Sequence, residues 1–335
     1  MASNPRPAQV TELPRSLYLE TTNRCDSECQ TCVRTFRTLE PAADLTLSRV
    51  KEIVAQFPVL DRVVLHGIGE PLLNREIFDI VAYLKGRVRV VLFNSDAISL
   101  TARRAGRLIE SGLDEYRVSM DAATRATYRR IRGVDQFDRV VENVRRLIQI
   151  ARDLERATPR VSLWFTASRA NLDELPEFVR LAAGLGVAEV YVQRLVFNGL
   201  GLATEENALH GQLRAREQTL LGEAETVARD SGLVMRASGL TTPLASLGGQ
   251  ASGRRPWAGC QRPWTLSYVT ANGNVLPCCI SPWVARDYEA LVLGNALRQP
   301  FAEIWNGEGY HRFRTDFESE SPPDPCRGCG LLWSI

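Results

Sequence analysis

The chain has 335 residues, which is enough for one large domain and a second, smaller one. Its formal net charge is only +2, so it lacks the strong positive field that attracts nucleic acid or anionic lipid, and we expect neither as a partner. The sequence has no apolar run of about 18 residues and no apolar signal core at its N-terminus, which predicts a protein of the cytoplasm rather than of a membrane.

Residues 1–15 are expected to form an N-terminal extension, and residues 16–21 are a short apolar run typical of a strand. Three cysteines follow this strand in a C-x3-C-x2-C pattern, at Cys25, Cys29 and Cys32. Three thiolates on one loop can hold three irons of a four-iron cluster and leave the fourth iron open to a small molecule, because soft sulfur ligands suit iron–sulfur clusters. A structural zinc site needs four ligands, and no fourth cysteine or histidine lies near this loop.

Strand-like and helix-like segments alternate from residue 16 to about residue 194. Six short segments, apolar and rich in β-branched or aromatic residues, are predicted to be strands buried on both faces: 16–21, 62–67, 88–94, 115–120, 160–167 and 189–194. Helical patterns lie between them; apolar residues recur at helical spacing from Leu47 to Phe57, and Pro58 ends that run. Six βα units predict an α/β protein with a parallel sheet and right-handed crossovers. In parallel barrels the chemistry lies at the carboxyl ends of the strands, where the cysteine loop begins.

Polar residues also follow the later strands. In residues 66–71, His-Gly-Ile-Gly-Glu-Pro, the glycines allow the backbone to approach a ligand and Glu70 can bind an ammonium group, although a turn with a capping carboxylate is the alternative. Asp121 lies after the fourth strand and is either a site residue or a helix N-cap. Arg130 and Arg132 are expected on a solvated helix face.

Beyond residue 194 the alternation becomes less regular. The expected elements are, in order, a flexible loop at 197–202, a long helix at 205–230 and a strand at 233–237. Glycine and serine are frequent in residues 238–253, which predicts a linker. The sequence therefore predicts a first domain over residues 16–237 and a second domain over residues 254–335.

A second set of cysteines follows this linker, at Cys260, Cys278, Cys279, Cys326 and Cys329. Asn-Gly at 272–273, between two β-rich runs, predicts a tight hairpin that brings Cys278 back toward Cys260. Four thiolates with the spacing C-x17-C-x47-C-x2-C can enclose one complete iron–sulfur cluster, although the spacing alone would favour zinc. Cys278 and Cys279 point opposite ways if they lie on a strand, so we expect only one of them, Cys278, to be a ligand.

The cysteine loop and the turn after the second strand resemble those of the radical S-adenosylmethionine (SAM) enzymes. In that family three cysteines hold a [4Fe–4S] cluster whose open iron chelates SAM, and reduction cleaves SAM to methionine and a 5′-deoxyadenosyl radical. Residues 66–71 are similar to the family's Gly-Gly-Glu-Pro motif, and Ser-Met-Asp at 119–121 with Ile-Arg-Gly at 131–133 is similar to a stretch of members with extra clusters. The resemblance implies a partial (β/α)6 TIM-like barrel. It also implies SAM contacts at Gly67, Gly69, Glu70, Pro71, Asn94, Ser119, Ser168 and Arg169.

The second cysteine set resembles the shortened form, called twitch, of the SPASM auxiliary domain. This resemblance implies a small C-terminal α+β domain and a second [4Fe–4S] cluster, and it therefore favours iron over zinc. The implied ligands are Cys260, Cys278, Cys326 and Cys329. A full SPASM domain carries two clusters, for which this segment has too few cysteines.

Radical chemistry on a small polar molecule is the function that we expect first. The spacing of the second cysteine set is similar to that of the deoxy-scyllo-inosamine dehydrogenases of this family, which implies oxidation or rearrangement of a sugar-like or other small natural-product substrate, with the auxiliary cluster as electron acceptor. A reductant such as flavodoxin or ferredoxin is implied as a partner. Modification of a peptide, for example thioether formation, is the alternative, although only 24 residues precede Cys25 and we expect no leader-binding domain there. RNA methylation, suggested by residues 67–74, is disfavoured by the near-neutral charge and by the second cluster.

Overall fold

One ten-stranded sheet runs through the residues that this computed structural model describes, which are 6–239, 241–249, 255, 257–284, 286–327 and 329. The strands are β1 (Ser16–Leu19), β2 (Arg62–Leu65), β3 (Val90–Ser95), β4 (Glu115–Ser119), β5 (Arg160–Ala167), β6 (Glu189–Arg194), β7 (Val234–Ala237), β8 (Leu266–Val269), β9 (Asn274–Leu276) and β10 (Gly294–Asn295). Their order across the sheet is β10-β9-β8-β1-β2-β3-β4-β5-β6-β7. Neighbours from β8 through β1 to β7 pair in parallel, and β9 and β10 are antiparallel to their neighbours. The predicted α/β fold with a partial parallel barrel is confirmed.

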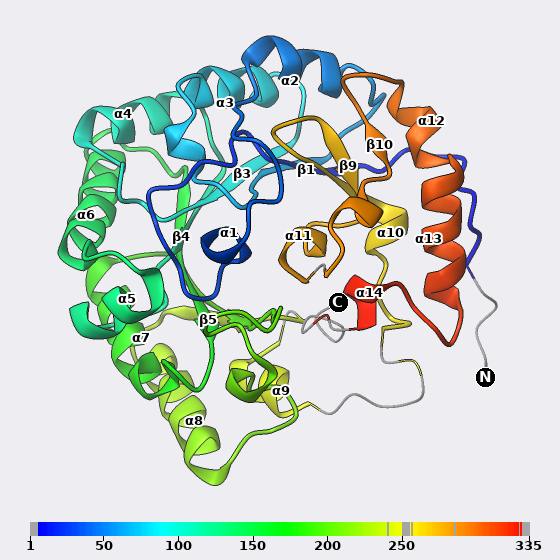
Figure 1. The fold of residues 1–335 in the computed structure, drawn as a ribbon. Helices are drawn as coiled ribbons and strands as arrows, with labels where there is room; N and C mark the ends of the chain where they lie inside the picture. Colours follow the sequence, from blue (N-terminus) through cyan, green and yellow to red (C-terminus); the bar gives the residue numbers. More distant parts are fainter. Residues whose placement is uncertain are drawn as a thin grey trace.

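Helices cover the outer face of the parallel strands (Figure 1). The helices of the described residues, including those of the cysteine loop and of the C-terminal segment, are α1 (Val33–Phe36), α2 (Leu47–Val54), α3 (Ile77–Lys85), α4 (Ala102–Glu110), α5 (Arg125–Arg132), α6 (Phe137–Asp153), α7 (Leu175–Leu185), α8 (Ala215–Asp230), α9 (Pro243–Gly248), α10 (Arg262–Thr265), α11 (Ser281–Val284), α12 (Phe301–Trp305), α13 (Glu308–Glu318) and α14 (Asp324–Arg327). Short 3₁₀ turns lie at Pro71–Leu73, Leu172–Glu174, Glu205–Asn207 and Glu289–Leu291. The predicted helix after Thr46 is confirmed as α2: the Thr46 side chain accepts from the Arg49 amide at its first turn, and Val50 and Ile53 are buried.

The strands of the barrel are buried under helices on one face only. In β5, Val161, Leu163 and Phe165 pack into the hydrophobic core, whereas the alternating residues Ser162 and Trp164 line an internal cavity. The expectation of strands buried on both apolar faces is therefore wrong for β5. The curved sheet encloses a space that polar side chains line, and this space holds the candidate site described below.

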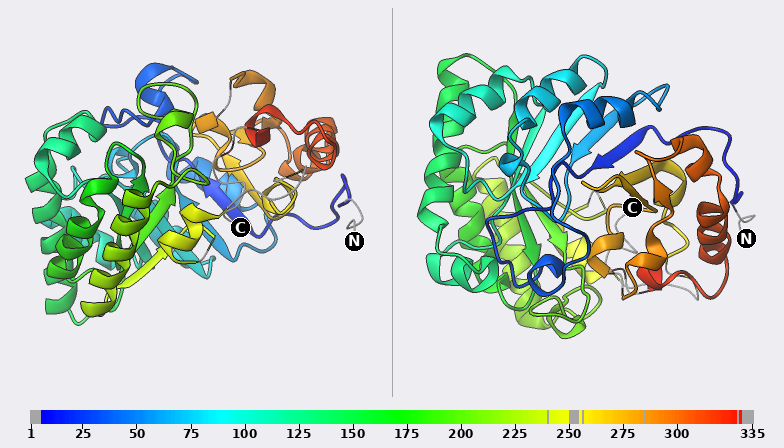
Figure 2. Two further views of the ribbon diagram at one scale, coloured as in Figure 1. Left: turned by 90° about the horizontal axis from the view of Figure 1, so that it is seen from below. Right: turned by 45° about the horizontal axis from the view of Figure 1, so that its top comes forward.

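The C-terminal segment continues the barrel sheet. Its first strand, β8, lies in register with β1, from Ser16 opposite Leu266 to Leu19 opposite Val269. The predicted hairpin is confirmed, since β8 and β9 are antiparallel and Gly273 takes the positive φ of 84° that the turn requires. Both views in Figure 2 show this segment, in orange and red, on the opposite side of the molecule from the green helices α7 and α8.

Two predictions for the region between the barrel and the second cysteine set are wrong. The helix expected over 205–230 is a 3₁₀ turn followed by α8, because Gly211 takes a φ of 69° and interrupts the helical backbone. The carboxylate of Glu217 accepts from the Arg214 amide at 2.7 Å and marks the start of α8. The linker expected over 238–253 instead contains α9, in which Ser246 and Leu247 are buried; residues 250–253 lie outside the described part of the chain.

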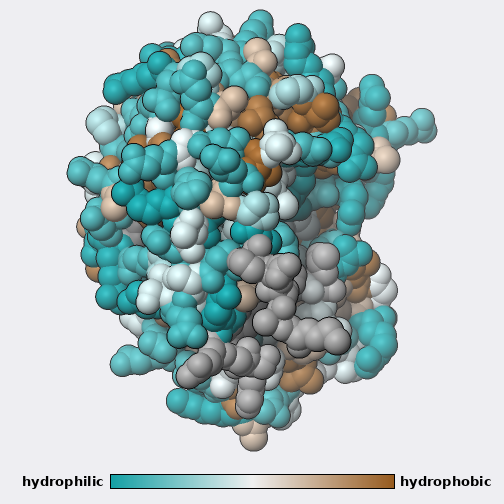
Figure 3. Space-filling model, turned by 90° about the vertical axis from the view of Figure 1, so that its right-hand side faces the viewer, coloured by the Kyte–Doolittle hydropathy of each residue, from teal (hydrophilic) through white to brown (hydrophobic). Residues whose placement is uncertain are grey.

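The described residues of the N-terminal extension pack against the C-terminal segment. Trp305 Nε1 donates to the Glu12 carbonyl at 3.0 Å, and Asn306 Nδ2 donates to the Val10 carbonyl at 2.8 Å. Figure 3 shows the side of the molecule that carries α13, where hydrophilic side chains dominate and hydrophobic ones form small patches. In the part of the chain that the structure describes, every helix is too short or too polar to cross a lipid bilayer.

Glu20 joins the barrel to the C-terminal segment. Its side chain is 2% exposed, and Oε2 accepts from the Tyr268 hydroxyl at 2.6 Å and from the Ile68 amide at 2.8 Å. Oε1 accepts from the Ala271 amide at 3.2 Å. One carboxylate at the end of β1 thus satisfies donors from the turn after β2 and from the β8–β9 hairpin.

Glu20→Ala should therefore lower the stability of the whole protein. The change leaves three buried donors without an acceptor, and each costs about 1–3 kcal/mol, so we expect the free energy of unfolding to fall by about 3 kcal/mol or more. Urea unfolding followed by circular dichroism measures the effect. Glu52→Ala, which removes an exposed carboxylate on α2, is the matched control. Equal urea midpoints for the two variants would contradict the role of Glu20.

Candidate active site

The cysteine loop after β1 forms one wall of a cavity of about 170 Å³ at the carboxyl ends of the strands. Cys25, Cys29 and Cys32 line this cavity together, so the three predicted ligands share one space. The strand ends opposite them contribute Gly67, Gly69, Glu70, Asn94, Ser119, Thr166 and Gln193. Most of the predicted SAM-contact residues are thus brought next to the three thiols, although their contact with SAM stays a prediction.

The C-terminal end of α5 supports the cysteine loop. The Glu28 amide donates to the carbonyl of Arg132 at 3.1 Å, and the Gln30 amide donates to that of Ile131 at 2.7 Å. Gly133 follows with a φ of 72°, and a Cβ at this position would lie 2.2 Å from the Glu28 carbonyl oxygen. Only glycine fits here, because both the backbone angle and the space exclude a side chain. The Ile-Arg-Gly triplet therefore positions the cysteine loop.

Arg132 is part of this site, and the expectation that it lies on a solvated helix face is wrong. It is 7% exposed, and its Nη1 donates to Asp121 Oδ2 at 3.0 Å. The N-cap alternative for Asp121 is also wrong, because Thr124 caps α5; Arg130 is exposed, as expected. Burial raises the pKa of the Cys29 thiol to about 12, and the charge of Arg132 opposes this effect. Arg132 therefore supplies positive charge where the cysteines need to be thiolates.

The glycines of the turn after β2 allow this turn to pack against the cysteine loop. A Cβ on Gly67 would lie 2.2 Å from Glu20 Oε2, and a Cβ on Gly69 would lie 2.1 Å from the Thr22 carbonyl oxygen. At each glycine the nearest atoms belong to the segment that leads from β1 into the cysteine loop. The close approach that the glycines permit is therefore between two protein segments, in addition to any approach of a ligand.

Glu70 is held rigidly at the edge of the cavity. Its Oε1 accepts from the Leu72 amide at 2.9 Å and from the Ser95 hydroxyl at 2.8 Å, and its Oε2 accepts from the Asp96 amide at 2.7 Å. Burial, together with the charge of Asp96, raises the pKa of Glu70 well above its usual value. A carboxylate has about four acceptor positions, so one remains for a cation in the cavity. Pro71 starts the 3₁₀ turn behind Glu70 and does not line the cavity.

Glu70→Ala should weaken SAM binding without loss of either cluster. A charge-assisted hydrogen bond to the SAM ammonium is worth about 1.5–3 kcal/mol, so the affinity should fall roughly 10- to 150-fold. Equilibrium dialysis of SAM against the cluster-loaded protein measures this. Glu28→Ala removes an exposed carboxylate from the cysteine loop and is the control. Unchanged SAM affinity in Glu70→Ala, with full iron content, would mean that Glu70 only shapes the turn.

The two predicted residues after β5 lie away from the cavity. The buried Ser168 hydroxyl donates to Asn171 Oδ1 at 2.9 Å, within the turn that leads to α7. Arg169 forms an ion pair with Glu217 at the start of α8. Thr166, two residues earlier on β5, lines the cavity instead. Thr166 continues the alternation of Ser162 and Trp164 on the cavity face of β5, whereas Ser168 and Arg169 lie beyond the end of this strand at Ala167.

The second cysteine set also comes together. Among the described residues, one small cavity next to α13 and α14 is lined by Cys260, Cys278, Cys326 and Cys329. Its other walls are mostly apolar, including Phe313 and Phe317. Cys279 is 4% exposed and lines a different and larger cavity inside the barrel, which is described below. The thiols of Cys278 and Cys279 therefore line different cavities. The donor set of four thiols fits one cluster, whereas residue 328 and residues 330–335 lie outside the described part of the chain.

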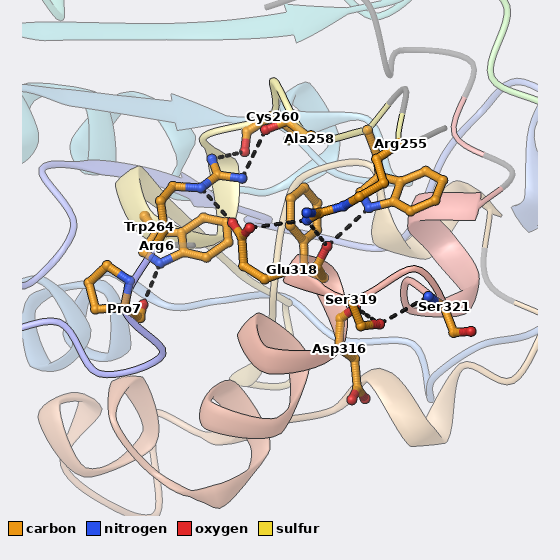
Figure 4. A network of polar contacts seen from close by, with 12 residues as sticks. Arg6, Pro7, Arg255, Ala258, Cys260, Trp264, Asp316, Glu318, Ser319 and Ser321 are labelled. Atoms are coloured by element: carbon orange, nitrogen blue, oxygen red, sulfur yellow. Dashed lines mark hydrogen bonds and ion pairs between the residues drawn. The ribbon is translucent and has the colours of Figure 1, made fainter. Parts of the chain in front are cut away.

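Arg6 binds the N-terminal segment to this second site (Figure 4). Its Nη1 donates to the carbonyl of Cys260 at 2.5 Å, its Nη2 to that of Ala258 at 2.9 Å, and its Nε to Glu318 at 2.7 Å. The guanidinium group also lies 4.0 Å from the centre of the Trp264 ring. The segment expected to be an extension therefore contributes to the support of a predicted cluster ligand.

Arg6→Ala should accelerate the loss of iron from the second site. The lost contacts are worth about 1 kcal/mol or more, which corresponds to at least about a fivefold faster release of iron to a chelator. Arg15→Ala removes an exposed arginine that pairs with Asp61 at 2.9 Å, and it is the matched control. Equal release rates in the two variants would show that Arg6 does not stabilise the site.

A larger cavity of about 290 Å³ fills the interior of the barrel and adjoins the cavity of the cysteine loop. The two cavities share His66, Asn94, Gln193 and Ile280. His66 stacks on Trp283, with 6.1 Å between the ring centres. Burial and then the charge of Arg117 lower the pKa of His66 to about 4, so its imidazole is uncharged at neutral pH.

Each group of cysteines lies in a segment that matches a known domain family. Residues 19–161 match the model of the radical SAM superfamily, and residues 260–330 match that of the SPASM iron–sulfur cluster-binding domain. This chain has a radical SAM domain followed by a SPASM domain. The radical SAM domain binds a [4Fe–4S] cluster and SAM. The SPASM domain binds auxiliary iron–sulfur clusters rather than structural zinc. The three and four thiols described above line two cavities and stay the predicted donors for these two groups.

The relatives of this radical SAM protein have diverse functions. It is 24% identical to the pre-heme d1 synthase of Dinoroseobacter shibae, over 90% of this chain and 76% of that protein. It is 26% identical to the PqqA peptide cyclase of Streptomyces rochei, over 94% of this chain and 81% of that protein. The crystal structure of Streptococcus suis SuiB bound to S-adenosylmethionine matches with a TM-score of 0.71 at 16% identity, over 97% of this chain and 72% of SuiB, which supports the fold alone.

Proposed function

We propose that this protein uses SAM to remove a hydrogen atom from a small polar molecule in the barrel cavity, and that this molecule is then oxidised or rearranged. The observation that carries the proposal is the position of the cavity between the two cysteine sets. The cavity shares Asn94 and Gln193 with the space next to the cysteine loop, and Arg262 with the space of the second set. A substrate held there adjoins both sites, as hydrogen abstraction followed by removal of an electron requires.

The chain's own residues bind and orient the reactants. When bound, the cluster on the cysteine loop supplies the electron that cleaves SAM, and the auxiliary cluster supplies an acceptor for the electron that an oxidised substrate loses. Glu70 offers its remaining acceptor position to the SAM ammonium group. His66 lies where the two cavities meet, and its uncharged imidazole can form a hydrogen bond with a substrate hydroxyl there.

Flavodoxin or ferredoxin is the proposed electron donor, and the cytoplasm is the proposed compartment. All eight cysteines fall into the two sets, Cys25 to Cys32 and Cys260 to Cys329. This grouping suits metal binding in a reducing compartment, where disulfides are rare. Reduction of the cluster-loaded protein by either carrier, followed by SAM cleavage, tests the partner directly.

Formation of 5′-deoxyadenosine in fractionated cell extract tests the proposed substrate class. The cluster-loaded protein is incubated with SAM, a reductant and either the low-molecular-mass filtrate or the retained fraction. We expect the filtrate to stimulate formation of 5′-deoxyadenosine, and treatment of the filtrate with protease to leave this stimulation unchanged. Stimulation by the retained fraction alone, or its loss after protease treatment, would contradict a small-molecule substrate.

Peptide modification is the second candidate. It is supported by the similarity to the PqqA peptide cyclase, which extends over 94% of this chain. The SPASM domain is common to both candidates and does not separate them. The protease experiment does, because only a peptide substrate is destroyed by that treatment.

A further inference from the structure

Charged residues line the barrel cavity, and their charges do not balance. Five arginines and two glutamates face it: Arg62, Arg117, Arg160, Arg236, Arg262, Glu115 and Glu189. Both glutamates already have partners within the protein. Glu115 pairs with Arg117 at 2.7 Å, and Glu189 pairs with Arg160 at 3.2 Å and with Arg236 at 3.8 Å. The arginines left over are Arg62 and Arg262.

Neither guanidinium group has a carboxylate partner among the described residues, although the charges of the nearby cysteines, Cys279 first, raise the pKa of Arg262 against the effect of burial. Among the residues that the structure describes, neither side chain forms an ion pair or a hydrogen bond. Arg62 lies against the ring of Tyr18, with 6.0 Å to the ring centre. Arg262 lies on α10, between the barrel cavity and the space of the second cysteine set. The wall of the cavity carries five arginines against two glutamates, and this excess of positive charge favours an anionic ligand.

The arginines also converge on one region of the cavity. Burial and the charge of Cys279 raise the pKa of the Tyr18 hydroxyl, and the charges of Arg62, Arg262 and Arg117 oppose this effect. Arg62, Arg117 and Arg262 line one cavity together with Tyr18 of β1. This region adjoins Cys279 but not the cysteine loop. Neither Arg62 nor Arg262 lines the cavity of the cysteine loop, which we call the SAM-side cavity.

We infer that Arg62 and Arg262 bind an oxyanion group, a carboxylate or a phosphate, at the end of the substrate that points away from SAM. Guanidinium groups match both anions, because each presents paired donors to paired oxygens. The anion would hold the substrate by one end, and the opposite end would lie at His66 and Asn94, where the barrel cavity meets the SAM-side cavity. This inference rests on the proposed function for the assignment of the barrel cavity as the substrate site.

Binding of inorganic phosphate and of succinate tests the inference. Isothermal titration calorimetry is carried out at low ionic strength on the anaerobic, cluster-loaded protein. We expect at least one of the two anions to bind, and we expect Arg62→Gln and Arg262→Gln each to weaken that binding about 10-fold or more. The control is Arg103→Gln, which removes an exposed arginine on α4. Preference for succinate would indicate a carboxylate substrate, and preference for phosphate would indicate a phosphorylated one.

The two variants also separate the possible failures. Arg262 adjoins the second cysteine set, so its variant is accompanied by an iron measurement; Arg62 does not line that space and carries the test by itself if the iron content of Arg262→Gln falls. Absence of anion binding in the unaltered protein, or unchanged binding in both variants, would overturn the inference. SAM cleavage is measured in parallel: cleavage without anion binding would contradict only this inference, and anion binding without cleavage would contradict only the proposed function.

Discussion

Replacing Cys25, Cys29 and Cys32 together by alanine should abolish SAM cleavage while the SPASM site keeps its iron. Among the described residues, these three are the only cysteines that line the cavity of Glu70 and Asn94. SAM cleavage needs the electron that a cluster on their thiols would supply. Iron should fall from about eight to about four atoms per chain, as expected for loss of one of two four-iron clusters. Iron analysis and chromatography of 5′-deoxyadenosine measure both effects.

Cys279→Ala is the matched control for this experiment. Cys279 belongs to the second cysteine set, but its thiol lines the barrel cavity and neither of the two cavities lined by the predicted cluster ligands, so the iron content should stay at about eight atoms per chain. Continued formation of 5′-deoxyadenosine by the triple variant would contradict the assignment of the cysteine loop. Iron near four in the unaltered protein, with zinc retained, would contradict a second [4Fe–4S] cluster.

Replacing Cys326 and Cys329 by alanine should separate SAM cleavage from product formation. These two thiols complete the second site, which adjoins the barrel cavity through Arg262. If the substrate loses an electron to this site, 5′-deoxyadenosine should still form, while oxidised product falls steeply. Quantification of 5′-deoxyadenosine and product in the same reaction gives the ratio of the two.

The folded state of this double variant is checked through its first cluster and its circular dichroism. A parallel fall of product and 5′-deoxyadenosine in a folded variant would mean that the second cluster is structural. The Arg6→Ala variant provides an independent comparison, because it weakens the support of Cys260 without removal of a thiol. Its product ratio should change only as far as its iron content falls.

Local sequence signals predicted the parts of the site that depend on nearby residues. The C-x3-C-x2-C loop, the parallel strands and the turn at Gly273 each lie within one short segment, and the structure has all three. Gly67, Gly69 and Glu70 were also predicted at the site, although the glycines contact the cysteine loop through Glu20 and Thr22. Such contacts join segments that are distant in sequence, so periodicity carries no information about them.

The residues that the sequence did not predict owe their positions to tertiary contacts. Arg132 ends a helix whose other arginines are exposed, and only the packing of that helix against the cysteine loop buries it. The arginine-rich lining of the barrel cavity could not be predicted from the sequence for a related reason. Alternation in β4 and β5 was present in the sequence, but polar residues at every second position also describe a strand with one face in water. The closure of the sheet turns that face into a cavity.

The pairing of β1 with β8 has a consequence for synthesis of the chain. Ser16 and Leu266 are opposite each other in the finished sheet, so β1 leaves the ribosome long before its second neighbour exists. Until residues 266–269 are made, one edge of β1 presents unpaired backbone groups, and an exposed edge strand is a template for aggregation. We therefore expect the nascent radical SAM domain to need protection of this edge until residues 266–269 have left the ribosome.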